Sequence, residues 1–416
     1  MALANWAGNV RFGAERVETP ASVDEVREML ASATRVRALG SAHSFNLIAD
    51  TDDTLLSTAR LITAPRIDTE ARTVTVGGGM RYGELAPALE AEGWALANLA
   101  SLPHISIAGA IATGTHGSGD AVGTLSSAVV GLQLVTPAGE VRELRRGDAD
   151  FDGAVVSLGA LGVVTEVTLD IEPTFAIRQR VYEKLPLEVA LAEFDAIMGA
   201  AYSVSLFHRW DDPDMVDQVW TKARGDEAPR LPVGIAEASE QVHMLAGVTP
   251  EATTPQRGEA GAWLDRLAHF KLSHTPSNGD ELQSEMLVPR AYAVDALRVV
   301  RGLAEQFAPL VQVMEIRSMR ADGLWLSPAY EQDTVGLHFT WLPRQSEVEV
   351  AVAILEQALE PFGARPHWGK LTRLDPRVLA AVWPRLGDFA ELAGRWDPAG
   401  KMRNPFLDRV LTASGR

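Results

Sequence analysis

Two stretches in the second half of the chain carry polar side chains in an alternating pattern that could form a reaction site. Residues 311–317 read Val-Gln-Val-Met-Glu-Ile-Arg and residues 335–341 read Val-Gly-Leu-His-Phe-Thr-Trp, so we expect two strands. The polar residues that share a face within each strand are Glu315 with Arg317 and His338 with Thr340. If the strands pair, these side chains form one group among apolar neighbours, where a charge needs a partner or a ligand. The alternative is a solvated face with an exposed ion pair worth about 0–1 kcal/mol.

A second stretch, residues 100–119, has no Asp, Glu, Lys or Arg and consists mostly of small residues. Glycines there let the backbone approach a ligand closely, and exposed backbone N–H groups can form a concave anion site. This pattern indicates a phosphate-bearing cofactor; the alternative is a tight loop between buried strands. Residues 157–162 are again small and uncharged, and we expect them to lie against the same ligand.

One histidine lies in a turn after an expected strand. The segment from Gly40 to Asn46 reads Gly-Ser-Ala-His-Ser-Phe-Asn, which places hydroxyls on both sides of His43. A structural role is one interpretation. The other is a histidine at a phosphate-binding turn, where its imidazole acts as a nucleophile.

Composition excludes several classes of protein. The 416 residues carry a net charge of −17, which argues against nucleic acid or an anionic membrane as the main partner. The chain has no cysteine, so it has no disulfide or thiolate chemistry. It shows no secretory signal pattern and no apolar run approaching the ~20 residues that span a bilayer. We therefore expect a soluble, cytoplasmic protein of two to three domains, with no metal site because no H-E-x-x-H spacing is present.

Periodicity and turn signals place the elements that hold these residues. A capping-box pattern at Ser22 and Glu25 predicts a helix over 22–34. The other expected elements are strands at 36–39, 55–61, 72–77, 163–169 and 203–210, a helix at 81–92, a hairpin at 129–136 and 141–144, and a surface excursion at 224–250.

Seven short motifs in their joint order resemble the vanillyl-alcohol-oxidase type of flavoprotein and, within it, the alditol (xylitol) oxidases of actinobacteria. These motifs are residues 40–46, 77–79, 104–119, 314–317, 338–341, 367–370 and 397–401. The resemblance implies an α+β fold with a FAD-binding domain over 1–173, made of two small sheets with flanking helices. It also implies a substrate domain over 174–374, in which helices cover a large antiparallel sheet, and a C-terminal segment over 375–416 that returns to the flavin domain. It implies FAD and not NAD, and the sequence agrees because no G-x-G-x-x-G follows an early strand.

The resemblance also implies roles for individual residues. His43 would be bonded covalently to the 8α-methyl group of FAD. The other FAD-binding positions would be Ala38, Leu39, Gly40, Ser41, Ala42, Ser44, Ser101, Ser106, Gly109, Thr113, Gly114, Thr115, His116 and Val164. The substrate-binding positions would be Ser101, Glu315, Arg317, Thr340 and Lys370, with His338 beside them.

The implied activity is oxidation of the terminal primary hydroxyl of alditols such as xylitol and sorbitol to the aldose, with hydride transfer to flavin N5 and reoxidation by O2 to H2O2. His338 and Lys370 are alternatives for the base, and Lys370 or Arg317 would stabilise the developing alkoxide. The nearest alternative activity is that of an aldonolactone oxidase or dehydrogenase. A non-catalytic flavin- or carbohydrate-binding protein and a metal-dependent hydrolase are more distant alternatives. We expect a monomer whose partners are a polyol and O2, without nucleic acid or membrane.

Overall fold

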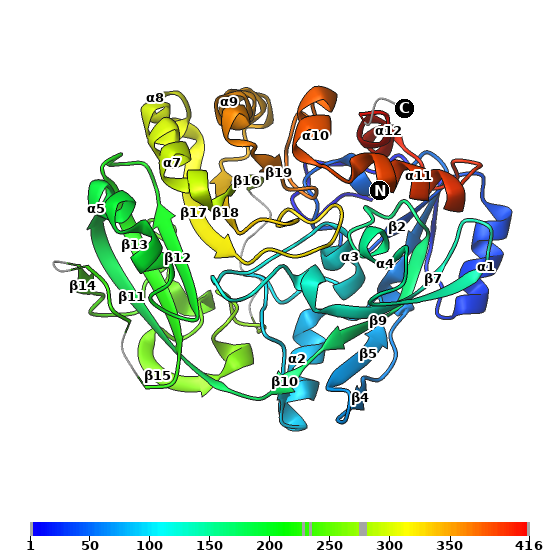
Figure 1. The fold of residues 1–416 in the computed structure, drawn as a ribbon, viewed down its shortest axis with the longest axis horizontal. Helices are drawn as coiled ribbons and strands as arrows, with labels where there is room; N and C mark the ends of the chain where they lie inside the picture. Colours follow the sequence, from blue (N-terminus) through cyan, green and yellow to red (C-terminus); the bar gives the residue numbers. More distant parts are fainter. Residues whose placement is uncertain (1–2, 227–228, 233–234, 274–280, 414–416) are drawn as a thin grey trace.

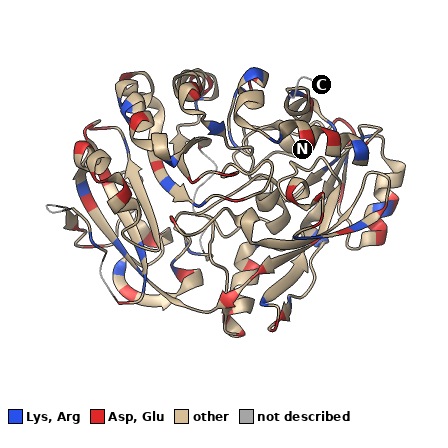
Figure 2. Cartoon of the chain, in the orientation of Figure 1, with Lys and Arg blue, Asp and Glu red and all other residues tan. Residues whose placement is uncertain are grey.

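The computed structural model describes residues 3–226, 229–232, 235–273 and 281–413. Two halves lie side by side, each with its own sheets (Figure 1). Acidic and basic residues are interspersed along the outer elements of both halves (Figure 2). No helix in these residues is long and apolar enough to cross a bilayer.

The first half contains two small sheets with helices against them. One sheet has three parallel strands in the order β1–β3–β2, which are Arg16–Glu18, Thr54–Ser57 and Val36–Leu39. The other has five antiparallel strands in the order β4–β5–β9–β7–β8, which are Arg66–Asp68, Thr73–Gly77, Val163–Asp170, Val129–Val135 and Val141–Arg145. A third, two-stranded sheet pairs β6 (Trp94–Ala95) with β10 (Glu172–Pro173).

The helices of the first half follow local signals in the sequence. They are α1 (Val23–Ser32), α2 (Tyr82–Ala91), α3 (Ile107–Ala112) and α4 (Phe151–Ala154). Helix α1 begins where predicted, because the hydroxyl of Ser22 accepts the backbone N–H of Glu25 at 3.2 Å. Its apolar positions Val26 and Leu30 are fully buried and pack against β2 and β7 residues.

The second half is built on one nine-stranded antiparallel sheet. Its strands in spatial order are β14 (Ala236–Glu237), β11 (Ala176–Pro186), β13 (Met215–Arg224), β12 (Ser203–His208), β17 (Val311–Met319), β18 (Thr334–Trp341), β16 (Leu282–Pro289) and β19 (Arg365–Pro366), with β15 (Arg257–Ala262) also paired to β11. This confirms the predicted α+β class and large antiparallel sheet.

Helices cover one face of this sheet, and the other face packs in part against residues 238–270 of the same half. The covering helices are α5 (Leu187–Ala192), α6 (Phe194–Met198), α7 (Ala293–Gly302), α8 (Ala304–Phe307) and α9 (Gln345–Leu359). Ile316 and Phe339 point into the core beneath these helices. Because strand side chains alternate, their neighbours Glu315 and His338 point to the opposite face.

The end of the chain packs against its beginning. Helices α10 (Pro376–Val382), α11 (Leu386–Trp396) and α12 (Pro405–Thr412) lie beside the first half (Figure 1). The guanidinium of Arg37 is 2 % exposed and donates to the carbonyls of Ile48, Leu158, Gly159 and Met402 at 2.5–3.0 Å. This single side chain therefore joins three distant segments. The domain limits at residues 173 and 374 stay predictions.

Some predicted element ends differ from the structure. The strand expected over 55–61 ends at Ser57, and a short 3-10 turn over 58–60 follows it, capped by the Ser57 hydroxyl. The strand expected over 203–210 ends at His208, because Trp210 has a φ of 67°, which a strand cannot contain. The excursion over 224–250 includes the short strand β14, and its residues 227–228 and 233–234 lie outside the described residues.

Candidate active site

The polar side chains of the large sheet form rows across its strands. Strands β17 and β18 pair antiparallel, with Glu315 opposite His338 and Val313 opposite Thr340. Strand β16 continues the same rows, because Glu285 lies opposite His338. The imidazole of His338 is therefore flanked by two carboxylates on neighbouring strands, and all three side chains line the same cavity.

Glu285 is the centre of this group. Its Oε1 lies 3.0 Å from Nε2 of His116 and 3.4 Å from Nη2 of Arg317, and its Oε2 accepts from Nζ of Lys370 at 2.5 Å. Lys370 Nζ also contacts Nδ1 of His338. Room for the carboxylate comes from Gly336, because a Cβ there would lie 2.6 Å from Glu285 Oε1. The buried carboxylate of Glu285 thus lies among four basic side chains, which are His116, Arg317, His338 and Lys370.

The electrostatics of Glu285 and Lys370 follow from this contact set. Burial alone raises the pKa of Glu285, but Lys370, His116 and Arg317 outweigh it and hold the pKa well below its usual range. Burial lowers the pKa of Lys370, although Glu285 opposes the change. Burial and the nearby Lys370 lower the pKa of His338 to about 4, so its ring is neutral near pH 7.

Glu315 has a separate set of partners. Its Oε1 accepts from Nε2 of His269 at 2.7 Å, and its Oε2 lies 3.6 Å from Nε of Arg317. Burial opposes ionisation, but Arg317 and His269 hold the pKa of this carboxyl well below its usual range. Behind it, Lys222 Nζ donates to His269 Nδ1 at 3.0 Å. Glu315 is therefore a fixed, ionised acceptor at the cavity wall.

His43 lines the same cavity as Glu285 and Glu315, and it lies in the turn after β2. Its Nδ1 lies 2.8 Å from the carbonyl of Ser41, which can only accept, so Nδ1 carries the proton and Nε2 keeps its lone pair. Its ring stacks on Trp6 with centroids 5.4 Å apart. Burial lowers the pKa of His43 to about 4. Ala42, just before it, has a φ of 56°, a backbone strain of the kind found at functional sites.

Glycines beside His43 let segments of the chain pack closely on one another. A Cβ at Gly40 would lie 2.3 Å from Ser106 Oγ, and one at Gly78 would lie 2.4 Å from the carbonyl of Val164. Ser41 and Ser106 exchange hydrogen bonds between their backbone N–H groups and hydroxyls at 3.1 and 3.2 Å. These contacts fix the turn against α3. The small residues that line this part of the cavity, among them Gly40, Ser41 and Gly109, and the unprotonated Nε2 of His43 both fit a flavin nucleotide.

The structure brings most of the sequence-predicted residues together in one cavity. Those that line it are Ala38, Leu39, Gly40, Ser41, Ala42, His43, Ser44, Ser101, Gly109, Thr113, Thr115, His116, Val164, Glu315, Arg317, His338, Thr340 and Lys370. Two predicted FAD positions are not among the lining residues. Ser106 is turned to Ser41, and Gly114 lies against Pro328, where a Cβ would be 2.6 Å from Cδ.

Two predicted residues have neighbours that the sequence did not suggest. His116 was expected at the cofactor, but its ring nitrogens face Glu285 Oε1 and, at 2.9 Å, the carbonyl of Gly117. Lys370 is carried by a loop that is bonded to the His43 turn, because Phe45 N–H donates to the carbonyl of Gly369 at 2.8 Å. This bond holds the Lys370 side of the site to the His43 side.

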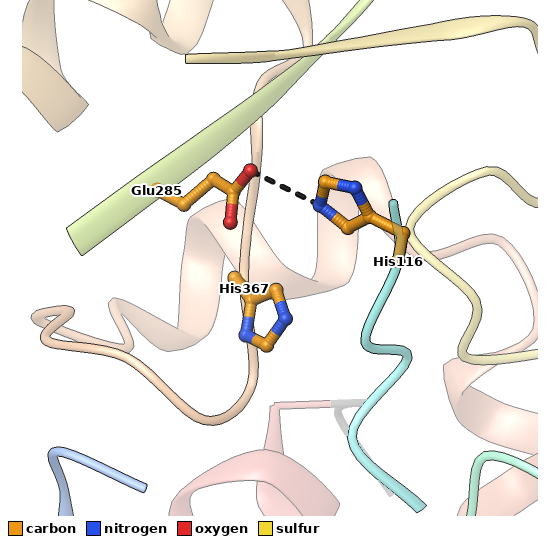
Figure 3. A group of neighbouring side chains, drawn as sticks. All are labelled: His116, Glu285 and His367. Carbon is orange, nitrogen blue, oxygen red and sulfur yellow. Dashed lines mark ion pairs between the residues drawn. The ribbon is translucent and has the colours of Figure 1, made fainter. Parts of the chain in front are cut away.

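One set of side chains has the composition of a metal site. Donor atoms of His116, Glu285 and His367 lie within 4.8 Å of one another (Figure 3). Two histidines and a carboxylate suit a divalent ion. Here, however, Lys370 and Arg317 already contact the two carboxylate oxygens, and their positive charges oppose a cation. We therefore assign no metal to this set.

Glu285, His269 and Lys222 belong to the site but were not predicted from the sequence. Glu285 had a usable signal, because Gln283 and Glu285 are two residues apart in a strand-like segment, as Glu315 and Arg317 are in β17. His269 is in an irregular segment after β15, where no periodicity exists. Lys222 is on a strand, but nothing in the sequence indicates that its ammonium group is buried.

Comparison with known families agrees with this geometry. A family profile described as a FAD binding domain matches residues 14–145, and one described as D-arabinono-1,4-lactone oxidase matches residues 278–410. The chain is 46 % identical over 414 residues to an alditol oxidase of a Streptomyces species, with 99 % of each chain covered. It is 29 % identical over 428 residues to an L-gulono-1,4-lactone dehydrogenase of Mycobacterium tuberculosis, with 98 % of each covered.

Solved structures agree on the fold. A cholesterol oxidase from Brevibacterium sterolicum superposes with a TM-score of 0.79 at 16 % identity and covers 99 % of this chain and 96 % of its own. A solvent-stable cholesterol oxidase gives a TM-score of 0.78 at 18 % identity, with 99 % and 97 % covered. The predicted two-domain FAD-binding fold and the predicted FAD cofactor are thereby confirmed.

Proposed function

Because the chain belongs to the alditol oxidases within the vanillyl-alcohol-oxidase type of FAD-dependent oxidoreductases, we propose that it oxidises the terminal primary hydroxyl of alditols such as xylitol and sorbitol to the aldose. When bound, FAD supplies the hydride acceptor and the route for electrons to O2, which leaves as H2O2. The chain's own residues bind the polyol, orient it and take up its proton. We expect it to do so as a monomer.

The observation that carries this proposal is the mixed lining of one cavity. Each hydroxyl of an open-chain polyol both donates and accepts, and leaving one unsatisfied on burial costs roughly 1–3 kcal/mol. Glu315 offers an acceptor, Arg317 offers donors, and Thr340 offers both. Every oxygen of a polyol can donate to the ionised Glu315, whereas an aldonolactone has hydroxyls that can donate but also two ester oxygens that only accept and would be repelled by this carboxylate.

The proton of the reacting hydroxyl would be taken up by the pair of Lys370 and His338. Their side-chain nitrogens are in contact, and burial lowers both pKa values, so Lys370 gives up its proton more readily than a free lysine, and its deprotonated form accepts the proton of the reacting hydroxyl. The proton would come to rest on Lys370 Nζ, because Glu285 Oε2 lies 2.5 Å away and stabilises the ammonium form there. Arg317 would stabilise negative charge that develops on the reacting oxygen.

The proposed covalent link rests on the orientation of His43. Since Nδ1 donates to the carbonyl of Ser41, the Nε2 lone pair is the nucleophilic atom. Neutralisation of the ring by burial keeps this lone pair available near pH 7.

A substrate panel tests the function. The purified holoenzyme is mixed without oxygen with xylitol, sorbitol or a set of aldonolactones, and the flavin absorbance is followed. Air is then admitted and peroxide is measured. We expect rapid bleaching by the polyols and one peroxide per polyol oxidised.

Two results would contradict the proposal. Faster bleaching by lactones would favour the alternative suggested by the lactone oxidase profile over residues 278–410. A bound flavin that no compound bleaches would indicate a binding protein instead of an enzyme.

A further inference from the structure

A line of hydrogen bonds runs away from the cavity behind Glu315. Lys222 Nζ contacts the carbonyl of Leu267 and lies 3.0 Å from His269 Nδ1, and His269 Nε2 lies 2.7 Å from Glu315 Oε1. All three ionisable side chains are buried, with Lys222 at 1 % and His269 at 4 % exposure. The burial of Lys222 beside His269 indicates a specific role, because removing two basic side chains from water costs free energy.

The chemistry of the partners fixes the direction of these bonds. An ionised carboxylate only accepts, so His269 Nε2 carries a proton and donates it to Glu315. The other ring nitrogen, Nδ1, faces a lysine nitrogen that donates whether it is charged or neutral. His269 is thus a neutral imidazole with a defined tautomer, in agreement with burial and Lys222 lowering its pKa to about 4.

Among the described residues, the ring of His269 bonds no other acceptor. Lys222 comes from β13, and Glu315 and Arg317 come from β17; these are the ionisable groups that act on its ring. The rings of Phe207 and Trp220 meet it edge-on, at centroid distances of 5.5 and 5.2 Å. The aromatic contacts prevent the imidazole from turning, so both of its nitrogens stay on the line between Lys222 and Glu315.

We propose that Lys222 and His269 are positioning residues that occupy Oε1 of Glu315 and so present Oε2 to a hydroxyl of the substrate. Oε2 lies on the Arg317 side, 3.6 Å from Nε, where the carboxylate lines the cavity. Because His269 holds Oε1, the carboxylate of Glu315 cannot rotate to form a bidentate ion pair with Arg317. This inference rests on the proposed function, because it assigns Glu315 to the binding of a polyol hydroxyl.

Enzyme kinetics with paired variants test the positioning role. His269→Gln places a carboxamide N–H where Nε2 lies, whereas His269→Leu has a similar volume and no donor. Lys222→Met keeps the buried stem and removes the donor to Nδ1. Lys271→Met serves as its matched control, since the side chain of Lys271 donates to an exposed carbonyl of Glu251 and has no other hydrogen bond among the contacts described. All variants are compared as holoenzymes with intact flavin absorbance.

We expect His269→Leu and Lys222→Met to raise KM for xylitol about tenfold or more, with a smaller fall in kcat, because the first loses the hydrogen bond to the ionised Glu315 and the second loses the donor that orients His269. His269→Gln should restore KM to within about threefold of the wild type, and Lys271→Met should match the wild type. Equal losses of kcat in the Leu and Gln variants, or an unchanged KM in Lys222→Met, would overturn the proposal.

A second measurement does not depend on polyol oxidation. NMR of the holoenzyme labelled with 15N-histidine, with the His269 signal identified by its loss in His269→Gln, reports which ring nitrogen carries the proton. We expect a neutral ring protonated at Nε2 near pH 7, and a rise in the midpoint of its titration in Lys222→Met.

The kinetic and the NMR experiments distinguish failure of the proposed function from failure of this inference. If the wild type oxidises no polyol, the proposed function fails, and the NMR result still decides the arrangement of His269. A ring protonated at Nδ1 in the wild type would overturn the inference even if polyol oxidation is normal.

Discussion

Replacing Glu285 by glutamine removes one negative charge from the buried contact of four basic groups while keeping the side chain's shape. His116 and Lys370 lie 3.0 and 2.5 Å from its carboxylate oxygens, and each would be left without its anionic partner. Removing one partner of a buried ion pair costs about 3–5 kcal/mol. With an unfolding entropy of roughly 0.9 kcal/mol/K for 416 residues, this corresponds to a Tm lower by about 3–6 °C.

The pH dependence of this loss has a definite sign. The pKa of Glu285 lies well below its ordinary value of 4.5, so its contribution to stability is full above pH 4.5 and is lost as pH falls through the folded-state pKa. The glutamine variant lacks that contribution at every pH. The gap in the free energy of unfolding between wild type and variant should therefore stay constant from pH 7 to about pH 5 and narrow below it.

Denaturant titrations of both holoenzymes at several pH values measure the gap. The matched control is Glu347→Gln, because Glu347 pairs with Arg344 at the surface, where their side chains are 53 % and 49 % exposed. That pair should contribute about 0–1 kcal/mol. A Glu285→Gln variant as stable as the control, or a gap that widens as pH falls, would refute the reasoning.

Three further predictions address the cofactor and the reaction. His43→Ala should keep FAD bound in the native protein but release all of it into the supernatant after acid precipitation, whereas the wild-type pellet stays yellow; equal pellets would exclude the covalent link. Lys370→Met should abolish polyol-dependent bleaching with FAD still bound, and a rate near that of the wild type would remove Lys370 from the base pair. Gly336→Ala should lower the rate of bleaching at least tenfold, because its Cβ would lie 2.6 Å from Glu285 Oε1 and displace the carboxylate; stopped-flow absorbance measures this, and an unchanged rate would contradict it.

The sequence predicts what depends on local periodicity. Alternation put Glu315 and Arg317 on one face and His338 and Thr340 on another, and the antiparallel pairing of β17 with β18 joins those faces. The Ser22 cap of α1 was likewise readable, because Ser22 and the Glu25 N–H that it caps lie within one helical turn; the Glu25 carboxylate itself accepts from Ala21 N–H instead of from Ser22.

Long-range partners could not be predicted in this way. Glu285 pairs with Lys370 across 85 residues and His269 with Glu315 across 46, so these contacts exist only after the sheet has formed. A lone lysine such as Lys222 normally extends into water, and its burial is a property of the folded surroundings and not of its own segment.

The buried Arg37 has a consequence for how the protein is made. One of its guanidinium nitrogens donates to the carbonyl of Met402, and the side chain of Asn404 donates to the carbonyls of Leu47, Ile48 and Asp50. A ribosome completes the first half of the chain long before it adds these residues. We therefore expect the core of the first half to close, and FAD to be loaded, only after residues up to about 404 have been translated.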